Sequence, residues 1–132
     1  MRYLLDTNAC IAVMRKHPAV VQRLSAQQPK DCAVSTVTSF ALYTGVEKCV
    51  APATERAKVD LLLATVRVLP FDSTAAQEAA RIRAVLESQG NPIGPYDVLL
   101  AGVAVANGLK MVSANVGEFQ RVPGLSVENW QT

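Results

Sequence analysis

The chain has 132 residues, of which 50% are hydrophobic and 18% are charged, so it is long and apolar enough to bury a core. Its net charge of +2 neither requires nor excludes a polyanionic partner, and 5% aromatic residues do not suggest stacking platforms for single-stranded nucleic acid. No apolar run approaches the roughly 18 residues of a membrane span. We therefore expect one domain over residues 1–132 and no membrane partner.

Cysteine usage points to a reducing compartment. Cys10, Cys32 and Cys49 follow no zinc-binding spacing, and their number is odd. The apolar run after Arg2 is too short for a secretory signal peptide. These features predict a cytoplasmic protein with free thiols.

Short apolar runs alternate with segments of helical periodicity along the whole chain. Strands are predicted at residues 3–5, 32–36, 66–71 and 110–113, with a weaker one at 125–127. Helices are predicted at residues 7–16, 19–28, 38–46, 52–66 and 72–86, and a further helix begins at Gly94-Pro95 and ends before Gly108. This alternation predicts a three-layer α/β/α sandwich with a central, mainly parallel sheet.

Two aspartates lie at a predicted strand end or helix start, where a ligand-binding or metal-binding site is expected in such a sheet. Asp6 follows the first predicted strand, at the edge where open α/β sheets bind ligands, although a helix N-cap explains it equally well. Asp97 lies on the first turn of a helix that is otherwise almost wholly apolar, which favours a nearby cation over a helix-dipole role alone. Two close carboxylates repel each other unless a cation lies between them. Oxygen ligands and water suit magnesium or manganese.

Three segments carry a family resemblance because they occur together and in order. They are Leu4-Leu5-Asp6-Thr7-Asn8, Ile93-Gly94-Pro95-Tyr96-Asp97 and Val112-Ser113-Ala114-Asn115-Val116-Gly117-Glu118-Phe119-Gln120-Arg121-Val122-Pro123-Gly124-Leu125. Over essentially its whole length, the chain resembles the VapC toxins of bacterial toxin–antitoxin pairs, which are PIN-domain endoribonucleases. The resemblance implies a PIN-like fold and cleavage of RNA phosphodiester bonds, often in structured RNAs such as transfer RNA. It also implies dependence on Mg²⁺ or Mn²⁺.

The resemblance also implies roles for individual residues. Asp6 and Asp97 match the metal-binding acids, and Asn115 falls where relatives carry Asp or Asn to orient metal-bound water. Asn8 and Ser113 match polar positions that line the pocket. Bound metal would lower the pKa of water and offset charge on the phosphate. We interpret the other acids, including Asp60, Glu78 and Glu118, as solvated surface residues, and Asp72 as a helix cap.

The chain departs from the family pattern at Ala41, where relatives carry a Glu of the acidic quartet. Its position three residues after Thr38 fits a capping box, so the family Glu could also be structural. Glu47 lies six positions later on a different helix face and cannot replace it. We expect weakened metal binding and slower turnover, whether Ala41 is natural or a deliberate inactivating change. The alternative is a catalytically impaired PIN protein that binds RNA or antitoxin.

Other α/β functions fit less well. A phospho-acceptor receiver domain needs an acid pair after its first strand, and a haloacid-type phosphatase needs an Asp where Asn8 stands. The resemblance implies a cognate VapB-type antitoxin and a homodimer or a toxin–antitoxin hetero-oligomer. Apolar residues Val20, Val21 and Leu24 and the run 61–63 would form either such an interface or simply core.

Overall fold

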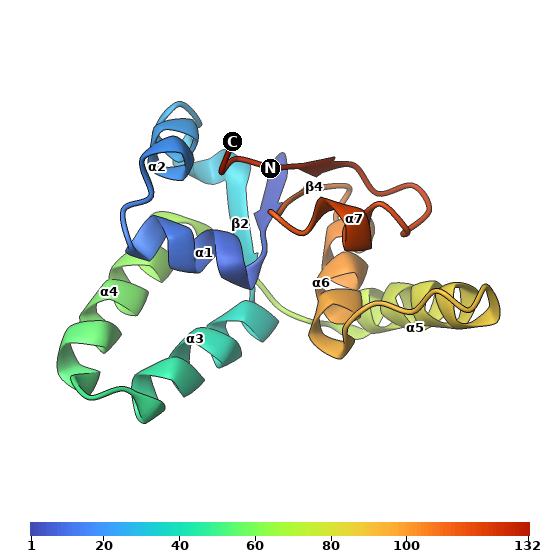
Figure 1. Cartoon of the computed structure of the whole chain (residues 1–132), viewed down its shortest axis with the longest axis horizontal. Coiled ribbons are helices and arrows are strands. Elements are labelled where there is room, and N and C mark those ends of the chain that lie inside the picture. The colour runs from blue at the N-terminus through green and yellow to red at the C-terminus, as the bar shows by residue number, and fades with distance from the viewer.

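A five-stranded parallel sheet forms the centre of the molecule. The computed structural model describes all 132 residues (Figure 1). The strands lie in the order β3-β2-β1-β4-β5, and every neighbouring pair is parallel. Their bounds are β1 Tyr3–Leu5, β2 Cys32–Ser35, β3 Arg67–Leu69, β4 Lys110–Val112 and β5 Val127–Glu128. The predicted three-layer sandwich with a parallel sheet is confirmed.

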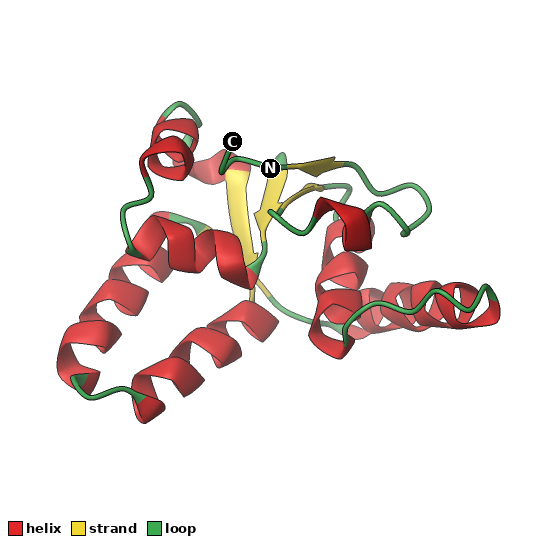
Figure 2. Ribbon diagram, viewed as in Figure 1, coloured by secondary structure: helices red, strands yellow, loops and turns green.

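Helices cover both faces of the sheet, as Figures 1 and 2 show. One face packs against α1 Thr7–Met14, α2 Pro18–Ser25, α3 Thr36–Lys48 and α4 Pro52–Thr65. The other face packs against α5 Ser73–Ser88, α6 Pro95–Ala106 and α7 Val116–Phe119. A short 3₁₀ helix, Pro29–Asp31, precedes β2.

The alternation of β1 side chains explains the two cores. Tyr3 and Leu5 point into the core under α1 to α4, whereas Leu4 points into the core under α5 to α7. All three are buried, as expected for a strand with helices on both sides. The Tyr3 ring also packs edge-on against Trp130, with centroids 5.1 Å apart, which fixes the end of the chain against the first strand.

The start of α3 differs from our prediction. The helix begins at Thr36, and the N-cap is Ser35, whose hydroxyl accepts a hydrogen bond from the Val37 amide at 3.0 Å. Thr38 is buried inside the first turn. The capping-box interpretation of position 41 is therefore wrong, because Ala41 lies well inside the helix.

Smaller differences concern short elements and apolar surfaces. The fifth strand comprises Val127 and Glu128 rather than 125–127, and neither α7 nor the 3₁₀ helix was predicted. Val20 and Leu62 are buried core residues, which settles the open choice for these two positions, whereas Leu61 is 70% exposed. None of the helices has the length and hydropathy of a membrane span.

Candidate functional site

The strand order creates a topological switch point at one end of the sheet, the region called the crevice from here on. From β1 the chain builds outward to β2 and β3, then returns to place β4 on the other side of β1. The carboxyl ends of β1 and β4 are therefore neighbours at a topological switch point, where open α/β sheets bind ligands. Asp6 directly follows β1, and Ser113 directly follows β4. The Asp6 amide donates to the Val112 carbonyl at 3.0 Å, which ties these two ends together.

Asp6 is held rigidly in this crevice. Asp6 is only 4% exposed. Its Oδ1 accepts a hydrogen bond from the Ala9 amide at 2.8 Å, so Asp6 caps α1. Burial raises the pKa of Asp6, while hydrogen bonds from Ser113 and the Ala9 amide oppose that rise. The N-cap and ligand interpretations are compatible, because a carboxylate has a second oxygen for a ligand.

Asp97 projects from the first turn of α6 toward the same cluster. Burial, followed by the negative charges of Glu118 and Asp6, raises its pKa to about 6. The charge of Asp6 contributes to this rise, so the two acids lie near enough at this end of the sheet to interact electrostatically. Their sharing of one metal ion stays a prediction.

Glu118 completes a group of three carboxylates that sequence reasoning missed. It lies on α7, hydrogen-bonds to Asp97, and accepts hydrogen bonds from the Gly94 amide and the Asn115 side-chain amide. Burial alone would raise the pKa of Glu118, but these hydrogen bonds and nearby Arg121 lower it on balance. Our interpretation of Glu118 as a solvated surface residue is therefore wrong.

The remaining predicted residues occupy different parts of the crevice. Ser113 is 1% exposed, and its hydroxyl accepts the Asn115 amide at 2.8 Å while supporting Asp6. Asn115 is exposed and directs its side-chain amide at Glu118. Asn8 is exposed on the first turn of α1 and stays a predicted pocket-lining residue.

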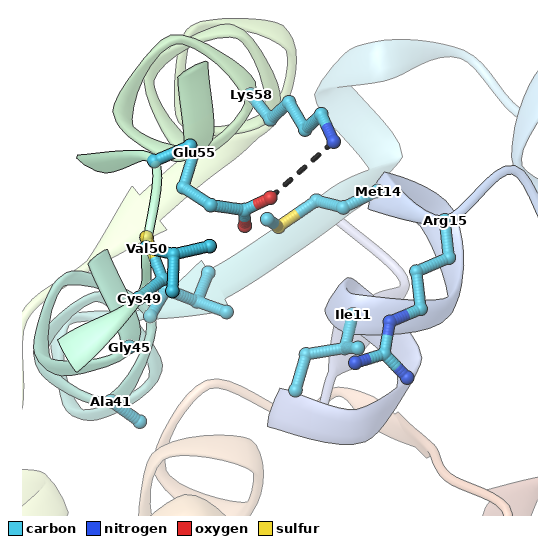
Figure 3. Close-up of a pocket in the computed structure, with 11 residues that line it drawn as sticks. Ile11, Met14, Arg15, Ala41, Gly45, Cys49, Val50, Glu55 and Lys58 are labelled. Carbon is cyan, nitrogen blue, oxygen red and sulfur yellow. Dashed lines mark hydrogen bonds and ion pairs between the residues drawn. The ribbon is translucent and has the colours of Figure 1, made fainter. Parts of the chain in front are cut away.

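Position 41 lies one helical turn beyond a contact between α1 and α3. The hydroxyls of Thr7 and Thr38 are 3.1 Å apart, so the start of α3 lies beside the Asp6 crevice. Ala41 then borders a pocket of about 430 Å³ between α1, α3 and α4 (Figure 3). The pocket is lined mainly by apolar residues, with the Glu55–Lys58 ion pair at its edge.

Comparison with known proteins assigns the family. Residues 3–125 match the family model of the PIN domain. The chain is 40% identical to the tRNA(fMet)-specific endonuclease VapC of Shigella flexneri and 37% identical to that of Salmonella typhimurium, in each case across 98% of both chains. The chain belongs to the VapC family of PIN-domain ribonucleases. The ribonuclease VapC2 of Haemophilus influenzae is 36% identical over the same share of both chains.

Solved structures agree with the VapC assignment. The chain superposes on a structure of DNA-bound VapBC from Salmonella typhimurium with a TM-score of 0.93 and 36% identity over 98% of both chains. A structure of VapBC2 from Rickettsia felis, bound to a promoter DNA fragment, gives a TM-score of 0.91 and 30% identity over 98% and 99% of the two chains. The sequence resemblance to VapC is thus confirmed in both sequence and fold.

The acidic crevice of this VapC chain has the chemistry of an open metal site. VapC nucleases of the PIN family generally depend on divalent metal ions. No group of three His, Cys, Asp or Glu side chains is placed so that it could hold a metal ion. Burial raises the pKa of Asp97, and the negative charges of Glu118 and Asp6 add to that rise, which a nearby cation would oppose. Oxygen ligands supplemented by water suit a hard cation such as Mg²⁺.

Proposed function

We propose that this chain is the toxin of a toxin–antitoxin pair and an endoribonuclease that hydrolyses RNA phosphodiester bonds at the crevice of Asp6, Asp97 and Glu118. The names of its VapC relatives include ribonuclease and tRNA(fMet)-specific endonuclease, so transfer RNA is the first substrate to test. The observation that carries the proposal is the placement of Asp6 after β1 beside the end of β4, with Asp97 and Glu118 near enough to interact: burial, then the charges of Glu118 and Asp6, raises the pKa of Asp97.

The side chains have distinct tasks in this proposal. Asp6 and Asp97 would hold Mg²⁺ or Mn²⁺ together with water, and the bound ion would acidify water and offset charge on the phosphate. Ser113 orients Asp6, and Asn115 orients Glu118, through the hydrogen bonds described above. Asn115 would thereby act on a carboxylate, in addition to its predicted role with water. Fixed ligands lower the cost of reorganisation during reaction.

Ala41 should reduce this activity without disturbing the fold. The residue lies inside α3, one turn after Thr38, whose hydroxyl lies 3.1 Å from that of Thr7 next to Asp6, and the family Glu would add a carboxylate there in place of a methyl group. Fewer anionic ligands mean weaker binding of a divalent cation. We therefore expect Ala41→Glu to raise cleavage of RNA in magnesium.

The direct test is magnesium-dependent cleavage of total RNA and of initiator transfer RNA by the unsubstituted chain, Ala41→Glu and Asp6→Ala. We expect the cleavage rate to be highest for Ala41→Glu, lower for the unsubstituted chain and lowest for Asp6→Ala. EDTA should abolish the activity, and Mg²⁺ or Mn²⁺ should restore it. Glu47→Ala is a matched control, because Glu47 is exposed on the same helix and pairs only with Arg56 at 3.2 Å. Cleavage that survives in Asp6→Ala or in EDTA would contradict the proposal.

The pocket beside Ala41 supports a second proposal, that this chain binds an antitoxin that inhibits it. The pocket is bordered by apolar residues, including Ile11 and Met14, and by Arg15 (Figure 3). Such a groove suits the apolar face of a peptide helix. The related solved structures are VapBC complexes, so we propose a VapB-type antitoxin as the occupant, within a toxin–antitoxin hetero-oligomer or a dimer of it.

Gly45 offers a clean way to test the pocket. It borders the pocket, and a Cβ built there meets nothing within 4 Å, so Gly45→Phe should fill the space without a clash. We expect this variant to lose co-purification with a co-expressed VapB-type antitoxin while keeping its circular dichroism spectrum. Leu61→Ala, on an exposed face of α4, is the control. Unchanged capture by Gly45→Phe would place the antitoxin elsewhere.

A further inference from the structure

The low aromatic content of the sequence does not suggest a stacking platform, but two of the seven aromatic side chains are strongly exposed and lie against each other. The chain has three phenylalanines, three tyrosines and one tryptophan. Tyr3, Phe119 and Trp130 are buried, and Tyr43 and Phe71 are partly covered. Phe40 and Tyr96, in contrast, are 59% and 57% exposed, and their ring centroids are 6.2 Å apart with planes inclined by 39°.

The position of this pair links it to the acidic crevice. Phe40 directly precedes Ala41 on α3, and Tyr96 directly precedes Asp97 on α6. The pair therefore bridges the two helices that flank the crevice, within one residue of a proposed metal ligand. Because more than half of each side chain is exposed, ring surface stays open to solvent beside the carboxylates.

We propose that Phe40 and Tyr96 form a stacking platform for an unpaired base of the RNA whose phosphate lies at the acidic crevice. This inference rests on the proposed ribonuclease function and adds the residues that position its substrate. Aromatic rings bind unpaired bases through their faces, whereas bases inside a duplex are already stacked. The platform thus selects single-stranded loops or bulges of an RNA as the place of cleavage.

Charge favours a base over a second copy of this chain at the same patch. A two-fold contact through the Phe40–Tyr96 pair would bring two acidic crevices toward each other, and their like charges would repel. A base is uncharged, and the phosphate that accompanies it is the group that a cation in the crevice would attract. The aromatic pair and the carboxylates therefore complement two parts of one nucleotide.

The test measures binding separately from cleavage. Single-stranded RNA oligonucleotides carrying 2-aminopurine at each position in turn are titrated with the protein in Ca²⁺, which supports oxygen coordination. We expect the fluorescence at one position to be quenched by stacking, and Tyr96→Leu or Phe40→Leu to remove that quenching. Affinity should fall by about 5- to 150-fold, the range that base–aromatic stacking carries. Tyr96→Phe should retain both signals, and Leu61→Ala is the exposed apolar control.

A coupling experiment assigns the effect to the base itself. An abasic site at the quenched position should weaken binding to the unsubstituted chain but cause no further loss with Tyr96→Leu. In the Ala41→Glu background, Tyr96→Leu should raise KM by more than it lowers kcat. If all variants bind RNA with equal affinity, the platform proposal is overturned. If Asp97→Asn still loses cleavage in that case, the nuclease proposal stands. Unchanged RNA binding together with a shift from dimer to monomer in Tyr96→Leu would overturn it in favour of a self-association surface.

Discussion

Replacing Asp97 with asparagine should make the metal-free protein more stable at neutral pH. Burial, then the charges of Glu118 and Asp6, raises the pKa of Asp97 to about 6, against an ordinary aspartate value of about 3.9. The free-energy cost of ionising Asp97 in the native state is then at most about 3 kcal/mol. Asp97 is only partly covered, so solvent screening reduces this to about 1–1.5 kcal/mol.

The sign of the effect follows from proton linkage. Between about pH 4 and pH 6 the native protein retains the Asp97 proton more than the unfolded chain does, so stability falls as pH rises through this window. Asp97→Asn removes the ionisation and can still donate a hydrogen bond to Glu118. Its melting temperature should therefore match the unsubstituted chain near pH 4 and exceed it by about 3–5 °C at pH 8.

Differential scanning fluorimetry in EDTA from pH 4 to pH 8 measures this difference. Asp60→Asn is the matched control, because Asp60 is exposed and accepts a hydrogen bond from the Tyr43 hydroxyl at 2.6 Å that an amide oxygen could also accept. We expect little pH-dependent change in the control. A melting-temperature difference for Asp97→Asn that is constant with pH, or negative at pH 8, would refute the raised pKa of Asp97.

Three further changes probe the site and its support. Mg²⁺ at ten times its Kd should stabilise the unsubstituted chain by about 1.4 kcal/mol at pH 8 and much less at pH 5, measured by fluorimetry, and this gain should be lost in Asp97→Asn. Gly102→Ala should lower the free energy of unfolding in urea by about 1–3 kcal/mol, because the new Cβ would lie 2.6 Å from the Ala75 carbonyl and from the Ala79 Cβ. Asp72→Ala should cost about 1 kcal/mol in the same assay, because Asp72 accepts the Ala75 amide at 2.9 Å.

A different result would contradict each of these three predictions. Equal magnesium stabilisation at pH 5 and pH 8 would mean that the ion binds elsewhere than at the ionised crevice. A neutral Gly102→Ala would mean that α5 and α6 can separate without loss of packing. Asp72→Asn should retain most of the cap, so an equal loss from asparagine and alanine would contradict capping as the cause.

The first strand and its acid were predictable because local signals agree. An apolar run too short for a helix ends at Asp6, a good N-cap, and helical periodicity begins at once. The proline at the start of α6 and the Asp72 cap were equally local. The edge rule places Asp6 at the end of β1, but it does not place Asp97, because Asp97 follows a helix and not a strand.

Glu118 could not be assigned in the same way. It lies on a four-residue helix that is too short to show periodicity, and its partner Gly94 is 24 residues away. The local signal was the spacing of Asn115 and Glu118, which places both on one face of a helical turn. The start of α3 was ambiguous for a different reason: Ser35, Thr36 and Thr38 are all reasonable caps, and the end of buried β2 selects Ser35.

The absence of a carboxylate at position 41 connects stability with function. Burial, together with repulsion from Glu118 and Asp6, already raises the pKa of Asp97. Another acid beside them would increase that repulsion in the metal-free protein, whereas Ala41 suits the interior of α3 and costs no cap. Ala41 should therefore favour the metal-free fold at the expense of ion affinity, the exchange expected when a residue serves a strained functional site. Ala41→Glu should reverse both properties together, lowering the melting temperature in EDTA while increasing the stabilisation by magnesium.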